Sequence, residues 1–347
     1  MINYKKQICA FFATTTTAIT IYIAILLYAT HILHLPLKNA EIWLDSLYEI
    51  KDYINAKSSD KQRLIIISGS NSLFGFDSSL IAKHTKYQPI NYATHAGLPI
   101  NYHIDKIIAN AKSGDIIAMP LEFEYYTRDK PQKDIWYIAN MLLWGRGYNK
   151  YISFSGYILA YFSDMPIDTI KRFAKHKNIN NNPKVEMQEI WTQNIATNNT
   201  CGEFDGYNYK SLNAYGDFCA QENKEPYVVD SDYNLNPNLQ ISQFFVYEFA
   251  RLEAFAKANN IKIILTYPVS AENKRFSINN PATHESIANL KAQLAQNGIR
   301  IYGDFADFHY PQKYFYDTAY HLNKQGAILR TQKFIELLEV LEKRADI

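Results

Sequence analysis

The sequence predicts an α/β fold built on a parallel sheet, preceded by one membrane-spanning helix. Short apolar runs rich in β-branched residues alternate with segments of helical periodicity, which is typical of a parallel sheet covered by helices on both faces. An uncharged apolar stretch near the N-terminus is long enough to cross a bilayer. The chain has 347 residues, of which 47% are hydrophobic, so it can also build a sizeable core.

The predicted membrane helix begins at Gln7, directly after Lys5 and Lys6, and ends near Leu35. About 20 apolar residues are enough to cross the hydrocarbon core, and threonines are tolerated because their hydroxyls can bond to the backbone one turn earlier. The two lysines indicate a cytoplasmic N-terminus, with the remaining domain in the periplasm or outside the cell. A cleaved signal peptide is the alternative, but no small-x-small cleavage motif follows the apolar run. We therefore expect an uncleaved single-pass anchor.

The pattern predicts five strands, four long helices and an amphipathic connecting segment over 39–62. The strands are expected at 63–67, 90–93, 115–119, 261–266 and 298–302, and the helices at 101–112, 242–259, 284–297 and 323–343.

We predict a cytoplasmic tip and anchor over 1–38 and one α/β domain over 39–347, with an insertion at about 125–240. The insertion has helical character over 134–176 and is loop-like beyond. Its apolar run at 151–162 is too short and too rich in tyrosine to be preferred as a second span.

The composition argues against several classes of function. The net charge is +2 and no basic block is present, so nucleic acid is a poor candidate as partner. The histidines show no metal spacing, and we expect no metal or other cofactor. The 27 tyrosines suit a sugar-binding surface or aromatic core packing equally well.

Cysteine usage agrees with export from the cytoplasm. Cys201 and Cys219 lie close together in a loop-like stretch, whereas Cys9 lies in the membrane segment. In an oxidising compartment a disulfide between the first two is expected, and closing a short loop in this way is worth about 3 kcal/mol. Two unpaired thiols are the alternative.

A serine, a histidine and an aspartate together predict a site for nucleophilic catalysis. Ser70 follows the first predicted strand at a sharp glycine turn, and open α/β sheets bind ligands beyond the carboxyl ends of their strands. A serine hydroxyl needs a base, which His321 can supply, and Asp317 can hold the imidazole in the tautomer that accepts the proton. A serine-rich turn or an Asp/His pair alone is more often structural, so the prediction depends on the combination and its order along the chain.

Three segments of the chain resemble blocks of the SGNH (GDSL-like) hydrolases. Residues 68–71 read Ser-Gly-Ser-Asn and resemble the first block. Residues 92–97 contain Gly97, which matches the family's oxyanion glycine, and residues 317–327 resemble the last block. The resemblance covers about 63–125 and 260–340. It is closest to the membrane-anchored branch that includes the teichoic-acid D-alanylation and alginate O-acetylation proteins.

The resemblance implies a flavodoxin-like three-layer sandwich and a serine esterase or O-acyltransferase that acts on acyl groups of cell-envelope glycans. It implies Ser70 as nucleophile with His321 and Asp317, and an oxyanion site made by the Ser70 amide and Gly97, which we extend to Asn71. A membrane-bound acyltransferase is a further partner to be expected. The alternative is a non-catalytic envelope-assembly protein that uses the fold to bind a glycan or a membrane partner.

The chain departs from the family pattern at three positions. Gly69 stands where the family usually has Asp, and three residues separate Asp317 from His321, where two are common. Glu122 stands in place of the oxyanion Asn after the third strand. Because a carboxylate does not donate to an oxyanion, Glu122 must have another role. We expect Glu122 and Glu124 to alternate along a strand end and face opposite sides.

Overall fold

The structure is a computed structural model. It describes residues 4–28, 32, 41–56, 60–129, 135–143, 151–163, 206–207, 209–218 and 230–347. The chain forms two compact units, of which the smaller comprises Met1–Asp45 and Lys133–Asn182 and the larger Ser46–Gln132 and Pro183–Ile347. Cys201 and Cys219 lie outside the described residues.

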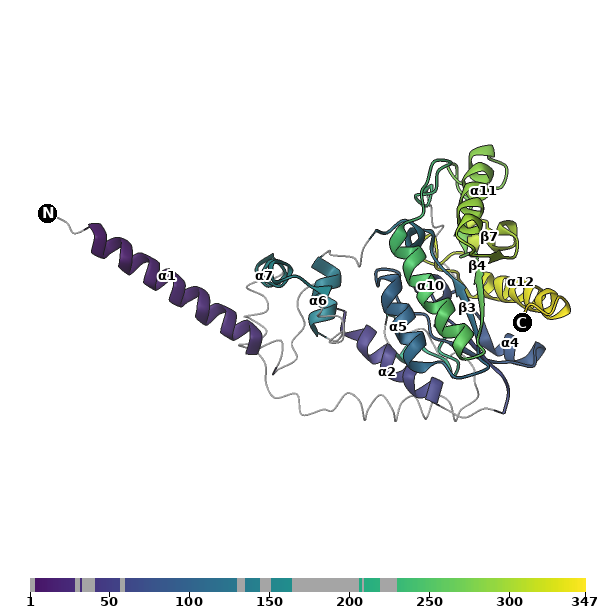
Figure 1. The fold of residues 1–347 in the computed structure, drawn as a ribbon, viewed down its shortest axis with the longest axis horizontal. Coiled ribbons are helices and arrows are strands. Elements are labelled where there is room, and N and C mark those ends of the chain that lie inside the picture. Colours follow the sequence, from purple (N-terminus) through teal and green to yellow (C-terminus); the bar gives the residue numbers. More distant parts are fainter. Residues whose placement is uncertain are drawn as a thin grey trace. The chain divides into compact units, whose positions relative to one another are not determined.

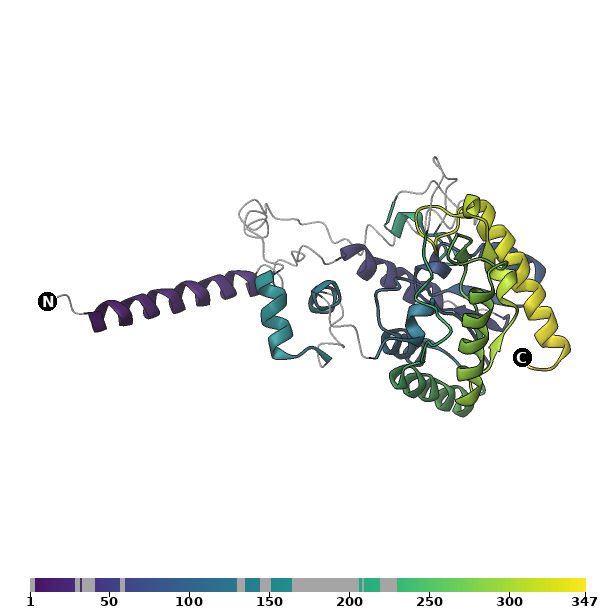
Figure 2. The same cartoon turned by 90° about the horizontal axis from the view of Figure 1, so that it is seen from above.

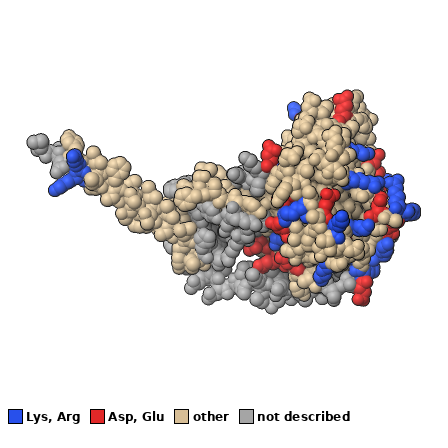
Figure 3. Space-filling model, viewed as in Figure 1, with Lys and Arg blue, Asp and Glu red and all other residues tan. Residues whose placement is uncertain are grey.

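The smaller unit contains the apolar helix that the sequence predicts. Helix α1 spans Tyr4–Leu27, is long and apolar enough to cross a membrane, and carries charge only near its N-terminal end (Figure 3). The hydroxyls of Thr14, Thr17 and Thr20 each donate to the carbonyl four residues earlier, as expected for threonine in an apolar helix. The same unit contains α6 (Ile135–Leu143) and α7 (Phe154–Ser163).

The larger unit is built on a parallel five-stranded sheet with the order β2-β1-β3-β4-β6. The strands are β1 (Arg63–Ile66), β2 (Gln88–Asn91), β3 (Ile116–Pro120), β4 (Lys262–Thr266) and β6 (Ile301–Tyr302). A separate two-stranded parallel sheet pairs β5 (Ser270–Ala271) with β7 (His309–Tyr310).

Helices cover the sheet, with α5 packed against α10 and α4 packed against α12 (Figures 1 and 2). The helices of this unit are α3 (Ser70–Leu73), α4 (Ser78–His84), α5 (Ile100–Asn110), α10 (Gln243–Ala258), α11 (Pro281–Gln296) and α12 (Lys324–Lys343), and α2 (Ile42–Ala56) leads into it. Right-handed crossovers require α4 and α5 to lie on opposite faces, because β2 and β3 flank β1 on opposite sides. The prediction of an α/β fold with a parallel sheet is confirmed.

Two predicted strands differ from those observed by two residues or more, and the other three by one residue at one end or both. The strand predicted at 90–93 lies at Gln88–Asn91. Of the run 298–302, only Ile301–Tyr302 is a strand, because Gly298 has a positive φ of 75° and closes the end of α11. The Gly298 amide donates to the Ala295 carbonyl at 3.0 Å, which leaves only the last two residues to pair with β4.

The strand order has a consequence for where ligands bind. Counting only the strands of the main sheet, the order is 2-1-3-4-5, and the chain leaves β1 and β3 for opposite faces. In such sheets the crevice beyond the carboxyl ends of these two strands is the usual ligand site. The loops there begin after Ile66 and after Pro120 and contain Ser70 and Glu122.

A buried ion pair joins the opposite end of the same two strands. The Arg63 Nε donates to Asp115 Oδ1 at 2.9 Å, and its Nη2 donates to the other carboxylate oxygen. Arg63 Nη1 also donates to the Asn55 carbonyl at 2.9 Å. Both charged side chains are almost fully buried, so each depends on the other for its charge to be compensated.

We predict that Asp115→Ala lowers the free energy of unfolding by about 3–5 kcal/mol, because it leaves the Arg63 guanidinium buried without a counter-charge. Thermal and urea unfolding of the full chain in detergent, followed by circular dichroism, measures the effect. Glu336→Ala is the control, since it removes an ion pair with Lys333 that is largely exposed and is worth less than about 1 kcal/mol. Equal losses in the two variants would contradict the prediction.

Candidate active site

Ser70 begins the one-turn helix α3, directly after the turn that follows β1. Within the part of the chain that the structure describes, its hydroxyl and its amide have no hydrogen-bond partner, and its carbonyl accepts from the Phe74 amide at 3.1 Å. The preceding Gly69 cannot carry a side chain. A Cβ there would lie 2.5 Å from Ala96 Cα and 2.5 Å from a carboxylate oxygen of Glu122.

The Glu122 carboxylate binds the turn that holds Ser70. One oxygen accepts from the Gly69 amide at 3.0 Å and the other from the Asn71 amide at 2.9 Å. Glu122 is completely buried, so these bonds compensate for its removal from water. The role that the sequence left open for Glu122 is therefore to fix the backbone on both sides of Ser70.

The expectation that Glu122 and Glu124 alternate on a strand end is wrong. β3 ends at Pro120, and Phe123–Tyr126 form a 3₁₀ helix. Glu124 accepts from the Tyr320 hydroxyl at 3.2 Å, and burial raises its pKa above the ordinary range. The two carboxylates therefore differ in their partners.

The structure does not favour Asn71 as an oxyanion donor. Both hydrogens of its amide are used inside the protein, by the Pro120 carbonyl at 2.8 Å and the Ser68 hydroxyl at 3.1 Å. Its carbonyl oxygen accepts from Arg330 at 2.8 Å, and both side chains are completely buried. Asn71 thus joins three elements of the fold and has no donor left for a substrate.

Gly97 follows Ala96, which lies against Gly69 in the Ser70 turn, but the Gly97 amide is also occupied. It donates to His95 Nδ1 at 2.8 Å, within a turn that follows β2. A rotation of the His95 ring would release this amide. Of the three proposed oxyanion donors, only the Ser70 amide is without a partner among the described residues.

Asp317 and His321 form a hydrogen-bonded pair despite the three residues between them. Asp317 Oδ1 lies 2.7 Å from His321 Nδ1. The Thr318 hydroxyl accepts the His321 amide at 3.1 Å and the Tyr320 amide at 3.2 Å, which shapes the turn that brings the carboxylate to the ring. Burial raises the pKa of Asp317, but the hydrogen bond and charge of His321 and a bond from Tyr207 outweigh it and lower that pKa.

Ring stacking places His321 against the helix that Ser70 begins. The His321 ring lies parallel to the Phe74 ring, with a centroid separation of 4.2 Å and an interplanar angle of 10°. Phe74 is the C-terminal cap of α3, one turn after Ser70. The base candidate therefore packs on the residue that ends the short helix begun by the nucleophile candidate. No hydrogen bond joins Ser70 to His321, and no partner for His321 Nε2 lies among the described residues.

Tyr207 is a site residue that the sequence reasoning missed. Its hydroxyl donates to Asp317 Oδ2 and lies 3.3 Å from His321 Nδ1, and its ring packs against Phe74 with centroids 5.5 Å apart. It lies in the loop-like part of the insertion, where no periodicity distinguishes one tyrosine from another.

The residues after Tyr207 are fixed to the larger unit by buried polar groups. Phe218 packs on Phe74 and donates its amide to the Leu73 carbonyl at 2.9 Å. Asp217 accepts from the Ser78 hydroxyl at 2.7 Å, and buried Lys51 donates to the Gly216 carbonyl at 2.8 Å. Burial raises the pKa of Asp217 and lowers that of Lys51 to about 7. This part of the insertion is therefore anchored beside α3.

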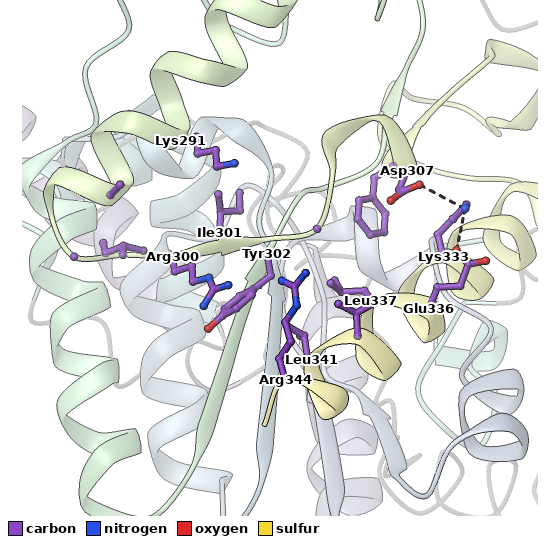
Figure 4. A pocket seen from close by; sticks show the side chains of 16 residues that line it. Lys291, Arg300, Ile301, Tyr302, Asp307, Lys333, Glu336, Leu337, Leu341 and Arg344 are labelled. Carbon is purple, nitrogen blue, oxygen red and sulfur yellow. Dashed lines mark hydrogen bonds and ion pairs between the residues drawn. The ribbon is translucent and has the colours of Figure 1, made fainter. Parts of the chain in front are cut away.

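A pocket of about 660 Å³ lies away from these residues, along the edge strand β6 (Figure 4). It is lined by residues of α11, β6 and α12 and of the segments that connect or follow these elements, among them Lys291, Arg300, Tyr302 and Arg344. None of the candidate site residues lines it. Among the residues that the structure describes, no cluster of three or more His, Cys, Asp or Glu side chains could hold a metal ion.

Comparison with models of known protein families finds no match for this chain, and comparison with curated proteins finds none either.

We predict that Tyr207→Phe raises the pKa of Asp317, because a hydroxyl that donates to a carboxylate favours its charged form. The ring contact with Phe74 is kept. Titration of ¹³C-labelled aspartate carboxyls by NMR measures the shift. Tyr247→Phe, an exposed site on α10, is the control. An unchanged Asp317 pKa in Tyr207→Phe would show that the hydroxyl does not bind this carboxylate in solution.

We predict that Glu122→Gln lowers the free energy of unfolding by about 1–3 kcal/mol, because one of the two backbone donors then faces an NH₂ group and loses its acceptor. Amide hydrogen exchange at Gly69 and Asn71 should become faster as well. Glu124→Gln is the matched control, since a carboxyl with a raised pKa is better mimicked by an amide. The same loss of stability in both variants would contradict the role of Glu122.

Proposed function

We propose that this chain is a membrane-anchored serine esterase or O-acyltransferase of the SGNH type that acts on acyl groups of cell-envelope glycans. The observation that carries the proposal is the stacking of His321, paired with Asp317, on the helix that Ser70 begins. A hydroxyl, a base and a carboxylate that orients the base are the groups that serine-based acyl transfer needs. They lie at the end of the sheet where ligands usually bind.

In the proposed reaction, Ser70 Oγ attacks the carbonyl carbon of the acyl group while His321 Nε2 takes the hydroxyl proton. Asp317 holds Nδ1 and stabilises the imidazolium that forms. The bond to the leaving oxygen then breaks, and that oxygen receives the proton from His321. Water or a sugar hydroxyl next attacks the acyl-serine, giving its proton to His321, and Ser70 recovers its own. Water makes the protein an esterase, and a sugar hydroxyl makes it an O-acyltransferase.

The oxyanion formed in each step needs donors. The unpartnered Ser70 amide is the first, and the Gly97 amide becomes the second when the His95 ring turns away from it. Each such donor is worth about 2.7–4 kcal/mol of transition-state stabilisation. The catalytic hydrogen bond from Ser70 to His321 forms only with substrate bound in this proposal, as is common for sites observed without substrate.

The glycan substrate and the location are supported by other features. The exposed ring of Tyr207 lies beside Asp317, and flat aromatic rings suit sugars. The apolar helix α1 follows two lysines, which favours a cytoplasmic N-terminus and a larger unit in the periplasm or outside the cell. A membrane-bound acyltransferase that delivers the acyl group is a partner compatible with this arrangement.

A second candidate is a non-catalytic envelope-assembly protein. The observation that favours it is that Glu122 takes the two amides on either side of Ser70, while Asn71 has no donor left. A site with so few oxyanion donors fits a protein that binds an acylated glycan or a membrane partner without turning it over.

We predict that a fluorophosphonate probe labels Ser70 in the full-length protein in detergent, and that His321→Ala slows labelling by at least about 100-fold, since a general base contributes this much. Mass spectrometry of the modified peptide locates the adduct. Ser72→Ala is the matched control, because it removes a buried hydroxyl from the same helix and must keep the labelling at Ser70.

Labelling at Ser70 that does not depend on His321 would contradict the proposed mechanism. No labelling of a folded sample would favour the non-catalytic candidate.

A further inference from the structure

Large apolar side chains that are exposed gather in two segments of the smaller unit. Most lie on α1 and just after it, and a second group comprises Tyr151, Phe154, Ile158 and Leu159. In the described part of the larger unit, the exposed large apolar side chains are single residues on separate elements. Scattered single residues are normal for a protein surface, but a contiguous group marks an interaction site.

Apart from Tyr151, which precedes it, the second group lies on α7, which begins where the Ser153 hydroxyl accepts the Gly156 amide at 3.2 Å. One face of α7 packs on α6, because a Cβ on Gly156 would meet the Ile138 side chain at 3.4 Å. Phe154 and Ile158, one turn apart, lie on another face, and Phe154 is 81% exposed. No charged residue occurs between Tyr151 and Ser163. A helix that is apolar all round is normally buried in protein or in lipid.

The hairpin of α6 and α7 is tied to the chain segment that follows the anchor. The Glu41 amide donates to the Asn140 side chain at 2.8 Å, and the Trp136 indole donates to the Glu41 carboxylate at 2.8 Å. Glu41 lies only 14 positions after Leu27, the last residue of α1. A chain of that length spans at most about 50 Å, so the hairpin cannot lie far from the point where the anchor leaves the bilayer.

From this continuity with the anchor we infer that α7 is a second membrane contact, which lies in the lipid headgroup region with the face of Phe154 and Ile158 toward the acyl chains. This inference rests on the membrane anchor of the proposed function. With 10 residues, α7 is about 15 Å long and cannot span a bilayer of about 30 Å. The exposed Tyr151, just before α7, suits the interface, where amphipathic rings are enriched.

The test uses the full-length protein in phospholipid vesicles that contain a lipid with a diazirine on its acyl chain. After illumination, mass spectrometry maps the lipid adducts. We expect adducts in both α1 and residues 151–163, and in the double variant Phe154→Glu, Ile158→Glu we expect loss of those in 151–163 with those in α1 kept. Tyr247, exposed on α10, is the internal control and should carry none.

Adducts in α1 without any in 151–163 would overturn the inference and leave the anchor intact, and this is also the result expected if a protein partner covers α7. Adducts in 151–163 without any in α1 would support the contact and contradict the anchor. Adducts at Tyr247 as frequent as those at Phe154 would mean unspecific labelling and would overturn the inference, as would adducts in 151–163 that survive in the double variant.

Discussion

The buried carboxylate of Glu122 holds the turn on which the candidate site depends. It accepts the backbone donors on both sides of Ser70, and Gly69 leaves the space that its oxygen needs. A charge in the apolar interior is costly unless it is hydrogen-bonded, so the carboxylate and the turn stabilise each other. From the other side, Arg330 of α12 donates to the Asn71 carbonyl and side chain at 2.8 Å each. Because α12 begins three residues after His321, the same contacts fix the helix that follows the candidate base.

The Ser70 turn is thus bound by two groups of opposite charge, the Glu122 carboxylate and the Arg330 guanidinium. Both charges affect the stability of an oxyanion formed at Ser70. Burial lowers the pKa of Arg330 to about 9, against the attraction of Tyr310 and Glu122, so the guanidinium keeps its charge at neutral pH. A carboxylate alone at this position would oppose the negative charge of an oxyanion. Asn71 lies between the Glu122 carboxylate and the buried Arg330 guanidinium. The carboxylate therefore fixes the backbone, while the positive charge of Arg330 offsets part of its negative potential at the site.

The sequence was informative where local pattern determines structure, and uninformative where distant contacts do. The apolar run and glycine turn placed Ser70 after a strand, and Asp317 and His321 are near enough in the sequence to meet in one turn. The prediction for Asn71 failed because its side chain is oriented by Pro120 and Arg330, which lie 49 and 259 residues away. Tyr207 reaches Asp317 from 110 residues away, out of a segment with no periodicity, so no pattern along the chain could select it.

The insertion is the part of the chain whose role depends most on these distant contacts. Its described first part, α6 and α7, belongs to the smaller unit together with the apolar helix α1, whereas its residues 209–218 are held in the larger unit by Lys51 and Asp217. Tyr207, just before these residues, adds a hydroxyl to the Asp317–His321 pair, and the first part exposes an apolar face. One insertion therefore contributes to both units. An extra segment that only extended a loop would need neither the contact with buried Lys51 nor the exposed apolar face of α7. Burying a charged group is costly unless it is hydrogen-bonded, and a contiguous exposed apolar surface marks an interaction site, so both features require specific partners.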